Sequence, residues 1–293
     1  MAEDMVLPVL ALNWPGQGGT IWSTEVFATN PGPLPVVLEV GPFLPGEIKT
    51  STPPCLPPIP FRHQLPPYST QLLTSAELSL AMGCPNSAIG GLIFSANAEV
   101  SLVARVANVA GLSTGSTLGA SISNLGPSTS ATGLRPRVHL AATSRSAAVS
   151  GVGQQVPATP SSQLVGPGTV YQVPGLIMDP NPCGAPRFEN YLYVANPGPE
   201  KVEVTLHQTQ NGESSGSLLL SGRPVITPYT FTVPASGWQQ VLVQMGGNGT
   251  GACVAPQVVD LFFTTTGNLA VVGTVVDLAS HDPRTVLPLA TIQ

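Results

Sequence analysis

The residue types that most often carry out chemistry are scattered along this 293-residue chain and form no motif. The four histidines fall in four different segments, and no two share a strand at the i, i+2 spacing that would put them on one face. A metal ion needs convergent ligands, so the sequence predicts no metal site. We interpret all four as exposed strand or loop residues: His63, His139, His207 and His281.

The serines are abundant but do not form a nucleophile motif. Neither G-x-S-x-G nor S-x-x-K occurs, so a Ser/His/Asp triad has no starting point in the sequence. The stretch GQGG, which begins at Gly16, is not expected to bind phosphate, because no helix follows it to direct an N-terminus at a phosphate. We therefore expect neither an enzyme nor a bound cofactor.

Acidic side chains come together in two loops. Asp179 and Asn181 lie in MDPNP, and Asp277 and Asp282 lie in VVDLASHDP. Calcium binds six to eight oxygen ligands, and loops of sandwich proteins can supply them. Asp and Asn also form turns through side-chain to backbone hydrogen bonds. We favour turns, with calcium binding as the alternative.

The cysteines contain no C-x-x-C pair and have no histidine at metal-ligand spacing. They are Cys55, Cys84, Cys183 and Cys253. Paired cysteines are typical of secreted proteins. The N-terminus MAEDMVLPVLALNW carries acidic residues where a signal peptide has a basic region. We expect an extracellular or cell-surface protein whose leader is absent from this chain. Four reduced thiols in a cytosolic protein are the alternative.

Composition predicts many short strands joined by turns. The chain has 32 prolines and 31 glycines, and this content excludes long helices. Charged residues make up 9% of the chain, against about 25% in an average soluble domain. The net charge is −5, and basic residues occur singly, which argues against nucleic-acid binding. The apolar runs are shorter than the about 20 residues that a membrane-spanning helix needs, so we expect no membrane insertion.

The strands that would position these residues follow an internal repeat. FATNPGPLPVVLEV, from Phe27, has a near twin 166 residues later in YVANPGPEKVEVTL, from Tyr193. In both, an aromatic and β-branched run meets Asn-Pro-Gly-Pro and returns as a second strand, a pattern that predicts a hairpin. GLIFSANAEVSLVARVAN, from Gly91, matches DLFFTTTGNLAVVGTVVD, from Asp260, at an offset of 169. Each of these two segments predicts an apolar strand, a polar turn and another apolar strand.

Two copies of one unit predict an all-β protein of two tandem Ig-like antiparallel β-sandwiches. Between the copies, GLSTGSTLGASISNLGPSTSATG is almost all small and polar, which is typical of a flexible connector or an exposed strand pair. We place sandwich unit one, with this connector at its end, at residues 1–134 and unit two at residues 135–293.

The repeat also predicts how the cysteines pair. Cys84 and Cys253 occupy equivalent positions of the two units. Equivalent positions of separate sandwiches should lie farther apart than the about 7 Å between Cα atoms that a disulfide allows. We therefore predict Cys55 with Cys84 and Cys183 with Cys253, one bond in each unit. Each would stabilise its unit by about 3 to 4 kcal/mol in the chain-entropy account.

The N-terminal MVLPVLALNW is a strongly apolar, extended segment ahead of the first repeat. Its counterpart in the second copy lies within GTVYQVPGLIM. We expect it to form an edge strand, either on its own sandwich or donated to a neighbouring molecule, where main-chain hydrogen bonds would supply affinity.

Several short motifs follow one another in a characteristic order. They are W-S-T-E-V with N-P-G, P-Y-S-T-Q-L, G-G-L-I-F, G-Q-Q-V-P-A, N-Y-L-Y-V-A-N-P-G and V-V-D-L-A-S-H-D-P. Together they resemble a largely uncharacterised group of secreted bacterial tandem-repeat β-sandwich (Ig-like) proteins. The resemblance covers most of the chain and implies an Ig-like fold and an extracellular setting. It brings no catalytic residues, and the missing leader departs from the pattern of the group.

These observations favour a non-enzymatic structural or adhesive protein that assembles with itself through edge strands, as a filament or surface-layer subunit. A freely diffusing monomer normally keeps a charged surface, whereas this chain must expose much neutral surface. The alternative is a module that binds surface glycans or another ligand through exposed aromatic rings. We expect most aromatic residues to pack in the core instead: Trp14, Trp22, Tyr68, Tyr171, Tyr191, Tyr193, Tyr229 and Trp238.

Overall fold

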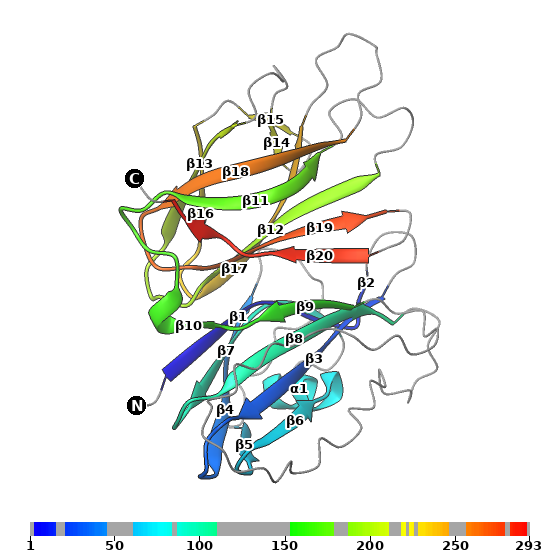
Figure 1. Cartoon of the computed structure of the whole chain (residues 1–293), viewed down its shortest axis with the longest axis vertical. Coiled ribbons are helices and arrows are strands. Elements are labelled where there is room, and N and C mark those ends of the chain that lie inside the picture. The colour runs from blue at the N-terminus through cyan, green and yellow to red at the C-terminus, as the bar shows by residue number, and fades with distance from the viewer. Residues whose placement is uncertain are drawn as a thin grey trace, which may run out of the picture. The chain divides into compact units, whose positions relative to one another are not determined.

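The computed structural model describes residues 3–15, 21–45, 61–83, 87–109, 153–178, 187–210, 218–220, 223–225, 228–245, 256–278 and 282–291. All of them belong to one compact unit, formed by Met1–Ala110 and Val152–Gln293. The all-β prediction is confirmed: four antiparallel sheets pair into two tandem sandwiches (Figure 1). The described helical segments are α1 (Ser75–Met82) and the 3-10 turn η2 (Ser161–Gln163). No described helix has the length and apolar character needed to cross a membrane.

Sandwich one consists of sheets I and II. Sheet I has the order β2 (Trp14–Pro15), β3 (Ile21–Asn30), β8 (Ser101–Asn108) and β9 (Gly153–Pro157), and β6 (Ser69–Leu73) also pairs with β3. Sheet II has the order β10 (Thr159–Pro160), β1 (Glu3–Leu12), β7 (Ala88–Ala96), β4 (Val36–Pro45) and β5 (Phe61–Leu65).

Sandwich two consists of sheets III and IV. Sheet III has the order β15 (Arg223–Val225), β14 (Leu218–Leu220), β17 (Gly237–Met245), β12 (Phe188–Asn196), β19 (Ala270–Asp277) and β20 (Asp282–Val286). Sheet IV has the order β16 (Tyr229–Val233), β13 (Val202–Gln210), β18 (Gln257–Thr265), β11 (Tyr171–Met178) and β21 (Leu289–Ala290). The path β6-β3-β8-β9 thus corresponds to β17-β12-β19-β20, and β10-β1-β7-β4-β5 corresponds to β21-β11-β18-β13-β16.

The two copies agree in detail as well as in strand order. The register of β1 against β7 shifts once, and that of β11 against β18 shifts at the equivalent place. Just after each shift a polar side chain from the opposite sheet accepts a backbone hydrogen bond. The amide of Ala11 donates to Thr24 Oγ1 at 2.8 Å, and the amide of Ile177 donates to Asn190 Oδ1 at 3.0 Å. The predicted repeat is therefore a repeat of structure.

The prediction that the Asn-Pro-Gly-Pro turns close hairpins is wrong. β3 lies in sheet I and β4 in sheet II, while β12 lies in sheet III and β13 in sheet IV. Each turn therefore carries the chain from one sheet of its sandwich to the other. The physical reason is that the prolines have no N–H and cannot continue a ladder of paired strands. The asparagine side chain instead forms hydrogen bonds to the carbonyl groups around the turn.

The N-terminal strand is not an edge strand, contrary to the prediction. β1 is the second strand of sheet II, between β10 and β7. Its residues from Met5 to Leu12 are all buried, because sheet I packs on one face of the strand and sandwich two packs on the other. A strand covered on both faces has a continuous apolar sequence without alternation. This double burial explains MVLPVLAL, which the sequence alone does not distinguish from an apolar edge.

Strand pairing assigns residues 153–160 to sandwich one. β9 pairs with β8 and β10 pairs with β1, as β20 pairs with β19 and β21 with β11 in sandwich two. Sandwich two joins β19 to β20 through residues 278–281 alone, whereas residues 109–152 separate β8 from β9. The boundary expected after residue 134 and the small-residue connector lie in this insertion, outside the described residues. In the described structure, sandwich two begins after Pro160.

Candidate functional site

The two sandwiches meet through sheet III, which packs on the outer face of sheet II and whose edge strand β20 also contacts β9 of sheet I. β12 and β19 contact β1, and β17 contacts β7 and β4. The side chain of Trp238 is 1% exposed, and its indole N–H donates to the carbonyl oxygen of Pro8 at 2.6 Å. β7 approaches so closely that a Cβ on Gly91 would stand 3.1 Å from the Cβ of Ala195. This junction has the packing of a protein core.

An aromatic ladder on β12 and β17 belongs to the junction. The ring centroids of Tyr191 and Tyr193 are 6.1 Å apart, and those of Tyr193 and Trp238 are 5.8 Å apart. Burial raises the pKa of both tyrosines well above the ordinary value. The Tyr191 hydroxyl also donates to Glu189 at 2.5 Å, and this bond and the charge of Glu189 raise the pKa of Tyr191 further. Both phenols are therefore neutral near pH 7 and cannot act there as anionic bases or nucleophiles.

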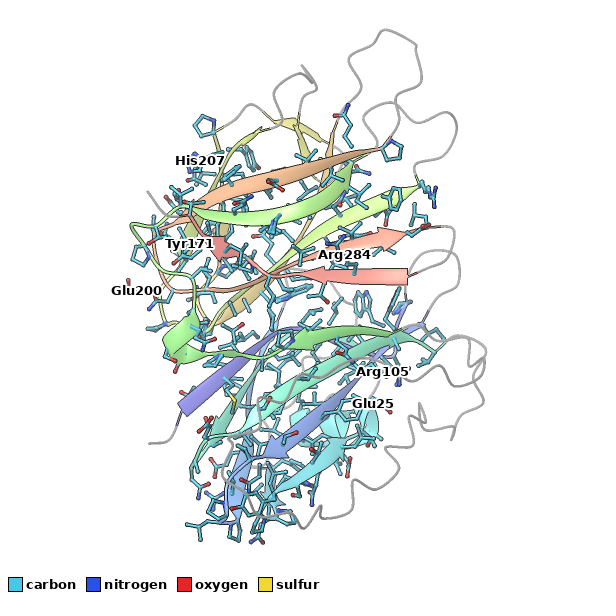
Figure 2. All side chains as sticks on the ribbon, viewed as in Figure 1. Glu25, Arg105, Tyr171, Glu200, His207 and Arg284 are labelled. Carbon is cyan, nitrogen blue, oxygen red and sulfur yellow. The ribbon has the colours of Figure 1, made fainter. Side chains whose placement is uncertain are left out.

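A groove of about 430 Å³ opens beside the junction. Asp4, Val6 and Ile93 of sheet II line one side, and the turn between β12 and β13, residues 196–202, lines another. Residues 161 and 164 and the turn at residues 266–268 complete the described lining. Glu200 and Lys201 bring charge to the rim, and Figure 2 labels Glu200 there. The groove is small, and none of the described residues that line it is aromatic.

Asn196 holds the turn beside this groove through hydrogen bonds of its side chain. We call residues 196–201, together with Ser236, 'tip two'. The Asn196 side chain is fully buried and accepts from the amide of Gly198 at 3.0 Å. Its Nδ2 donates to the carbonyls of Glu200 at 2.7 Å and Pro234 at 2.8 Å. Ser236, which has a left-handed φ of 45°, donates its amide to the Gly198 carbonyl at 2.8 Å. These bonds fix the turn between the two sheets.

Sandwich one has an equivalent turn. We call residues 30–35, together with Tyr68, 'tip one'. Asn30 is fully buried, accepts from the amide of Gly32 at 2.9 Å, and donates to the carbonyls of Leu34 at 2.8 Å and Pro66 at 3.0 Å. The amide of Tyr68, at a φ of 50°, donates to the Gly32 carbonyl at 3.1 Å. Tip one and tip two are therefore equivalent in backbone and in hydrogen bonding.

The two tips differ in what they expose. Leu34 is 72% exposed and Tyr68 is 73% exposed, whereas tip two has Glu200 and Ser236 at these places. A side chain other than glycine in the left-handed region costs about 1 to 2 kcal/mol, so backbone geometry does not favour tyrosine at this position. The expectation of core packing is wrong for Tyr68, although it is right for Trp238. The signal in the sequence was Pro-Pro-Tyr, a tyrosine in a turn with no apolar alternation around it.

The other residues considered from the sequence do not converge. His63 bonds Gln71 and stacks on Phe61, and His207, labelled in Figure 2, bonds Thr264 Oγ1 at 3.0 Å. In the part of the chain that the structure describes, no three His, Cys, Asp or Glu side chains gather as metal ligands do.

The acidic loops are described only in part. Asp277 pairs with Arg187 at 3.3 Å, and its backbone pairs with that of Asp282. The partner of Asp277 is therefore a guanidinium group, which agrees with a structural role. Asp179, Asn181, His139 and His281 lie outside the described residues.

All four cysteines also lie outside the described residues. The pairings Cys55 with Cys84 and Cys183 with Cys253 therefore stay predictions. The strands on either side of them, β7 and β18 above all, are equivalent in the two sandwiches, as the predicted pairing assumes.

Comparison with known protein families, with curated proteins and with solved structures finds no match. The tandem β-sandwich part of the resemblance noted in the sequence agrees with the structure. Its family assignment stays a proposal.

Proposed function

We propose that this protein is a non-enzymatic structural protein of the cell exterior that associates with copies of itself. The observation that supports it is the exposure of large apolar side chains at two separate places. Tip one exposes Leu34 and Tyr68, and the segment after β20 in sandwich two exposes Leu287 and Leu289 at 46% and 56%. Single exposed apolar residues are ordinary, but groups of them mark contact surfaces.

Low charge strengthens this interpretation. With 9% charged residues, the chain has few groups to surround these apolar side chains and keep monomers apart. The exposed outer face of sheet IV is instead rich in neutral hydroxyls, as in the Thr205 and Thr230 pair, whose Oγ1 atoms lie 2.9 Å apart. A surface of neutral side chains loses less hydration energy than a charged surface does when a second protein covers it.

The non-enzymatic part of the proposal is supported by the partners of the described titratable side chains. His63, His207 and Asp277 each bond a neighbouring strand or turn, as a side chain with a structural role does. A catalytic acid or base must in addition reach a substrate proton. The extracellular setting rests on the cysteines and on the resemblance to secreted tandem-sandwich proteins.

The groove beside the junction favours one second candidate, a module that binds a small polar ligand. Asp4, Glu200 and Lys201 could orient such a ligand. If this is the function, a glycan array should show binding by the monomer, and Lys201→Ala should abolish the signal.

The test of the proposed function is electron microscopy of the purified full-length protein over a range of concentrations. Filaments, rings or sheets are the expected result. Single particles at every concentration, together with specific glycan binding, would replace the proposal with the ligand-binding candidate.

A further inference from the structure

The two tips share a backbone but present different side chains. Residues 30–35 and 66–68 of sandwich one correspond to residues 196–201 and 234–236 of sandwich two. Where sandwich two has a charged residue or a serine, sandwich one has an aliphatic or aromatic residue. The replacements are Leu34 for Glu200, Pro35 for Lys201 and Tyr68 for Ser236. Tip one therefore carries no charge.

The surface of tip one is exposed and rigid. Leu34 and Tyr68 are 72% and 73% exposed. The hydrogen bonds of Asn30 and the fixed φ angles of the prolines hold the backbone in one conformation. A surface that is already rigid loses little conformational entropy when a partner binds it. The exposed prolines next to these two residues in the chain are Pro31, Pro33, Pro35, Pro66 and Pro67.

The fold itself does not require a tyrosine at position 68. Ser236 has the same left-handed conformation, with a φ of 45° against 50° for Tyr68. Each of the two donates its amide to the glycine carbonyl of its tip. The ring of Tyr68 thus adds apolar area at a place where a small polar residue holds the same turn. A large, exposed aromatic ring on a rigid turn is typical of the anchor residue of an interface.

The groove beside the junction has the size and the lining to take such an anchor. Its volume of about 430 Å³ lies within the range of about 300 to 1,000 Å³ that is usual for ligand pockets. In its lining Ile93 and Leu164 are half-buried and Pro199 is exposed, so apolar surface is accessible there. Asp4 supplies a carboxylate that can accept from a phenol. None of the described lining residues belongs to tip one of the same molecule.

We infer that tip one of one molecule inserts Leu34 and Tyr68 into the groove of a second copy. Sheet II and tip two both line the groove, so the contact would continue the junction that already joins the two sandwiches. The inference rests on the proposed function, because it names the partner and the two surfaces of that self-association.

The charges of the groove are compatible with an apolar guest. Glu200 and Lys201 are exposed on the rim. Their charged ends can stay in water while the apolar lining is covered, which avoids the cost of burying an unpaired charge. An uncharged tip brings no like charge against either of them.

A contact between a tip and a groove is heterologous, so each molecule keeps one free surface of each kind after docking. Such contacts form rings when the rotation closes and open filaments when it does not. Blocking either surface leaves the other intact, and this property gives the inference a specific test.

The test blocks each surface separately. Leu34→Glu and Tyr68→Ser each give tip one the residue that tip two has at the same place. Ser161→Trp fills the groove, and Gln163→Trp is its matched control, because Gln163 is exposed on the same turn, η2, and is not among the described lining residues. Leu80→Glu is the control for tip one, because Leu80 is 78% exposed on α1.

Sedimentation velocity is measured for the wild type, for each variant and for an equimolar mixture of Leu34→Glu and Ser161→Trp. Thermal melting confirms that every variant is folded. We expect the wild type and the two controls to assemble alike. Each blocked variant should need a more than about tenfold higher concentration for half-association. The mixture should form one-to-one dimers and nothing larger, because it offers one native tip and one native groove to each pair.

A photo-crosslinker identifies the surface that tip one contacts. Benzoylphenylalanine in place of Tyr68 should crosslink to residues 161–164, 197–202 or 266–268 of a second copy. Mass spectrometry of a mixture of isotopically labelled and unlabelled protein distinguishes these links from links within one molecule.

Several results would overturn the inference. Blocked variants that assemble like the wild type, controls that lose assembly as the blocked variants do, or crosslinks to another part of the second copy would refute these surfaces and leave the proposed function standing. A mixture that stays monomeric would refute the pairing of tip with groove. A wild type that is monomeric at every concentration would refute the proposed function itself.

Discussion

The indole N–H of Trp238 in sandwich two donates a 2.6 Å hydrogen bond to the carbonyl oxygen of Pro8 in sandwich one. Both partners are buried, and the residues are 230 positions apart. The bond therefore joins the last part of the chain to the first strand inside one continuous core, to which Ala195 and Val272 also belong. Two sandwiches joined in this way should unfold together.

Replacing Trp238 should separate the two unfolding events. Trp238→Ala should cost about 3 to 5 kcal/mol of unfolding free energy, because it empties a large buried site. Trp238→Phe keeps most of the ring but leaves the Pro8 carbonyl without its donor, which should cost about 1 to 3 kcal/mol. Urea unfolding followed by circular dichroism measures both. A single unchanged transition for Trp238→Ala would contradict the account of the junction.

The asparagines of the two tips should be equally important for stability. Asn30→Ala and Asn196→Ala should each cost about 1 to 3 kcal/mol, because each leaves carbonyls and an amide without partners. Asn30→Asp should cost at least as much, since it turns a donor into a charged acceptor that faces carbonyl oxygens. Asn268→Ala, at an exposed asparagine, is the control and should stay within about 0.5 kcal/mol of the wild type. Equal melting of Asn30→Ala and Asn268→Ala would refute the role of the buried amide.

The sequence predicts the strands much better than it predicts their partners. The NPGP motif shows that two strands meet at a turn, but the hydrogen bonds of Asn30 decide that they belong to different sheets. Those bonds reach Leu34 and Pro66, and the second of these lies 36 residues away in the sequence. β1 shows the same limit, because its burial on both faces depends on sandwich two. Local pattern cannot reveal a contact that only the tertiary structure creates.

The candidate surfaces were harder to predict than the fold. An exposed Tyr68 and a buried Trp238 both occur in short polar contexts, Pro-Tyr-Ser and Gly-Trp-Gln. Ser236 and Tyr68 are equivalent residues with left-handed backbone conformation. Two residues after them, one copy of the repeat has the buried Trp238 and the other has Thr70. Only the packing of sheet III on sheet II explains why one copy needs a large ring there.

Stability should fall in alkali because of Tyr191. Its pKa is raised in the folded protein, by burial first and then by Glu189, whereas an unfolded tyrosine ionises near pH 10. Below about pH 10 the phenol is neutral in both states and has no effect on the pH dependence. Above it the unfolded chain loses its proton first, so the unfolding free energy should decrease as pH rises. Tyr191→Phe should make this decrease shallower. Urea unfolding between about pH 8 and pH 11 tests it, with values near pH 8 as each variant's own baseline, and equal slopes would contradict it.

The cysteines should form one disulfide in each sandwich. A non-reduced digest analysed by mass spectrometry should contain a peptide linking Cys55 to Cys84 and another linking Cys183 to Cys253. Reduction should lower the unfolding free energy of each sandwich by about 3 to 4 kcal/mol. Free thiols throughout would support a cytosolic protein, and a Cys84 to Cys253 link would contradict the separation of equivalent positions.

The central claim, self-association of a structural protein, is tested most directly by sedimentation velocity of the full-length wild type over a wide range of concentrations. The account predicts a weight-average sedimentation coefficient that rises steadily with concentration, as open or ring-forming contacts require. It also predicts that the rise disappears in Leu34→Glu and persists in Leu80→Glu. One sharp monomer boundary at every concentration would contradict the claim.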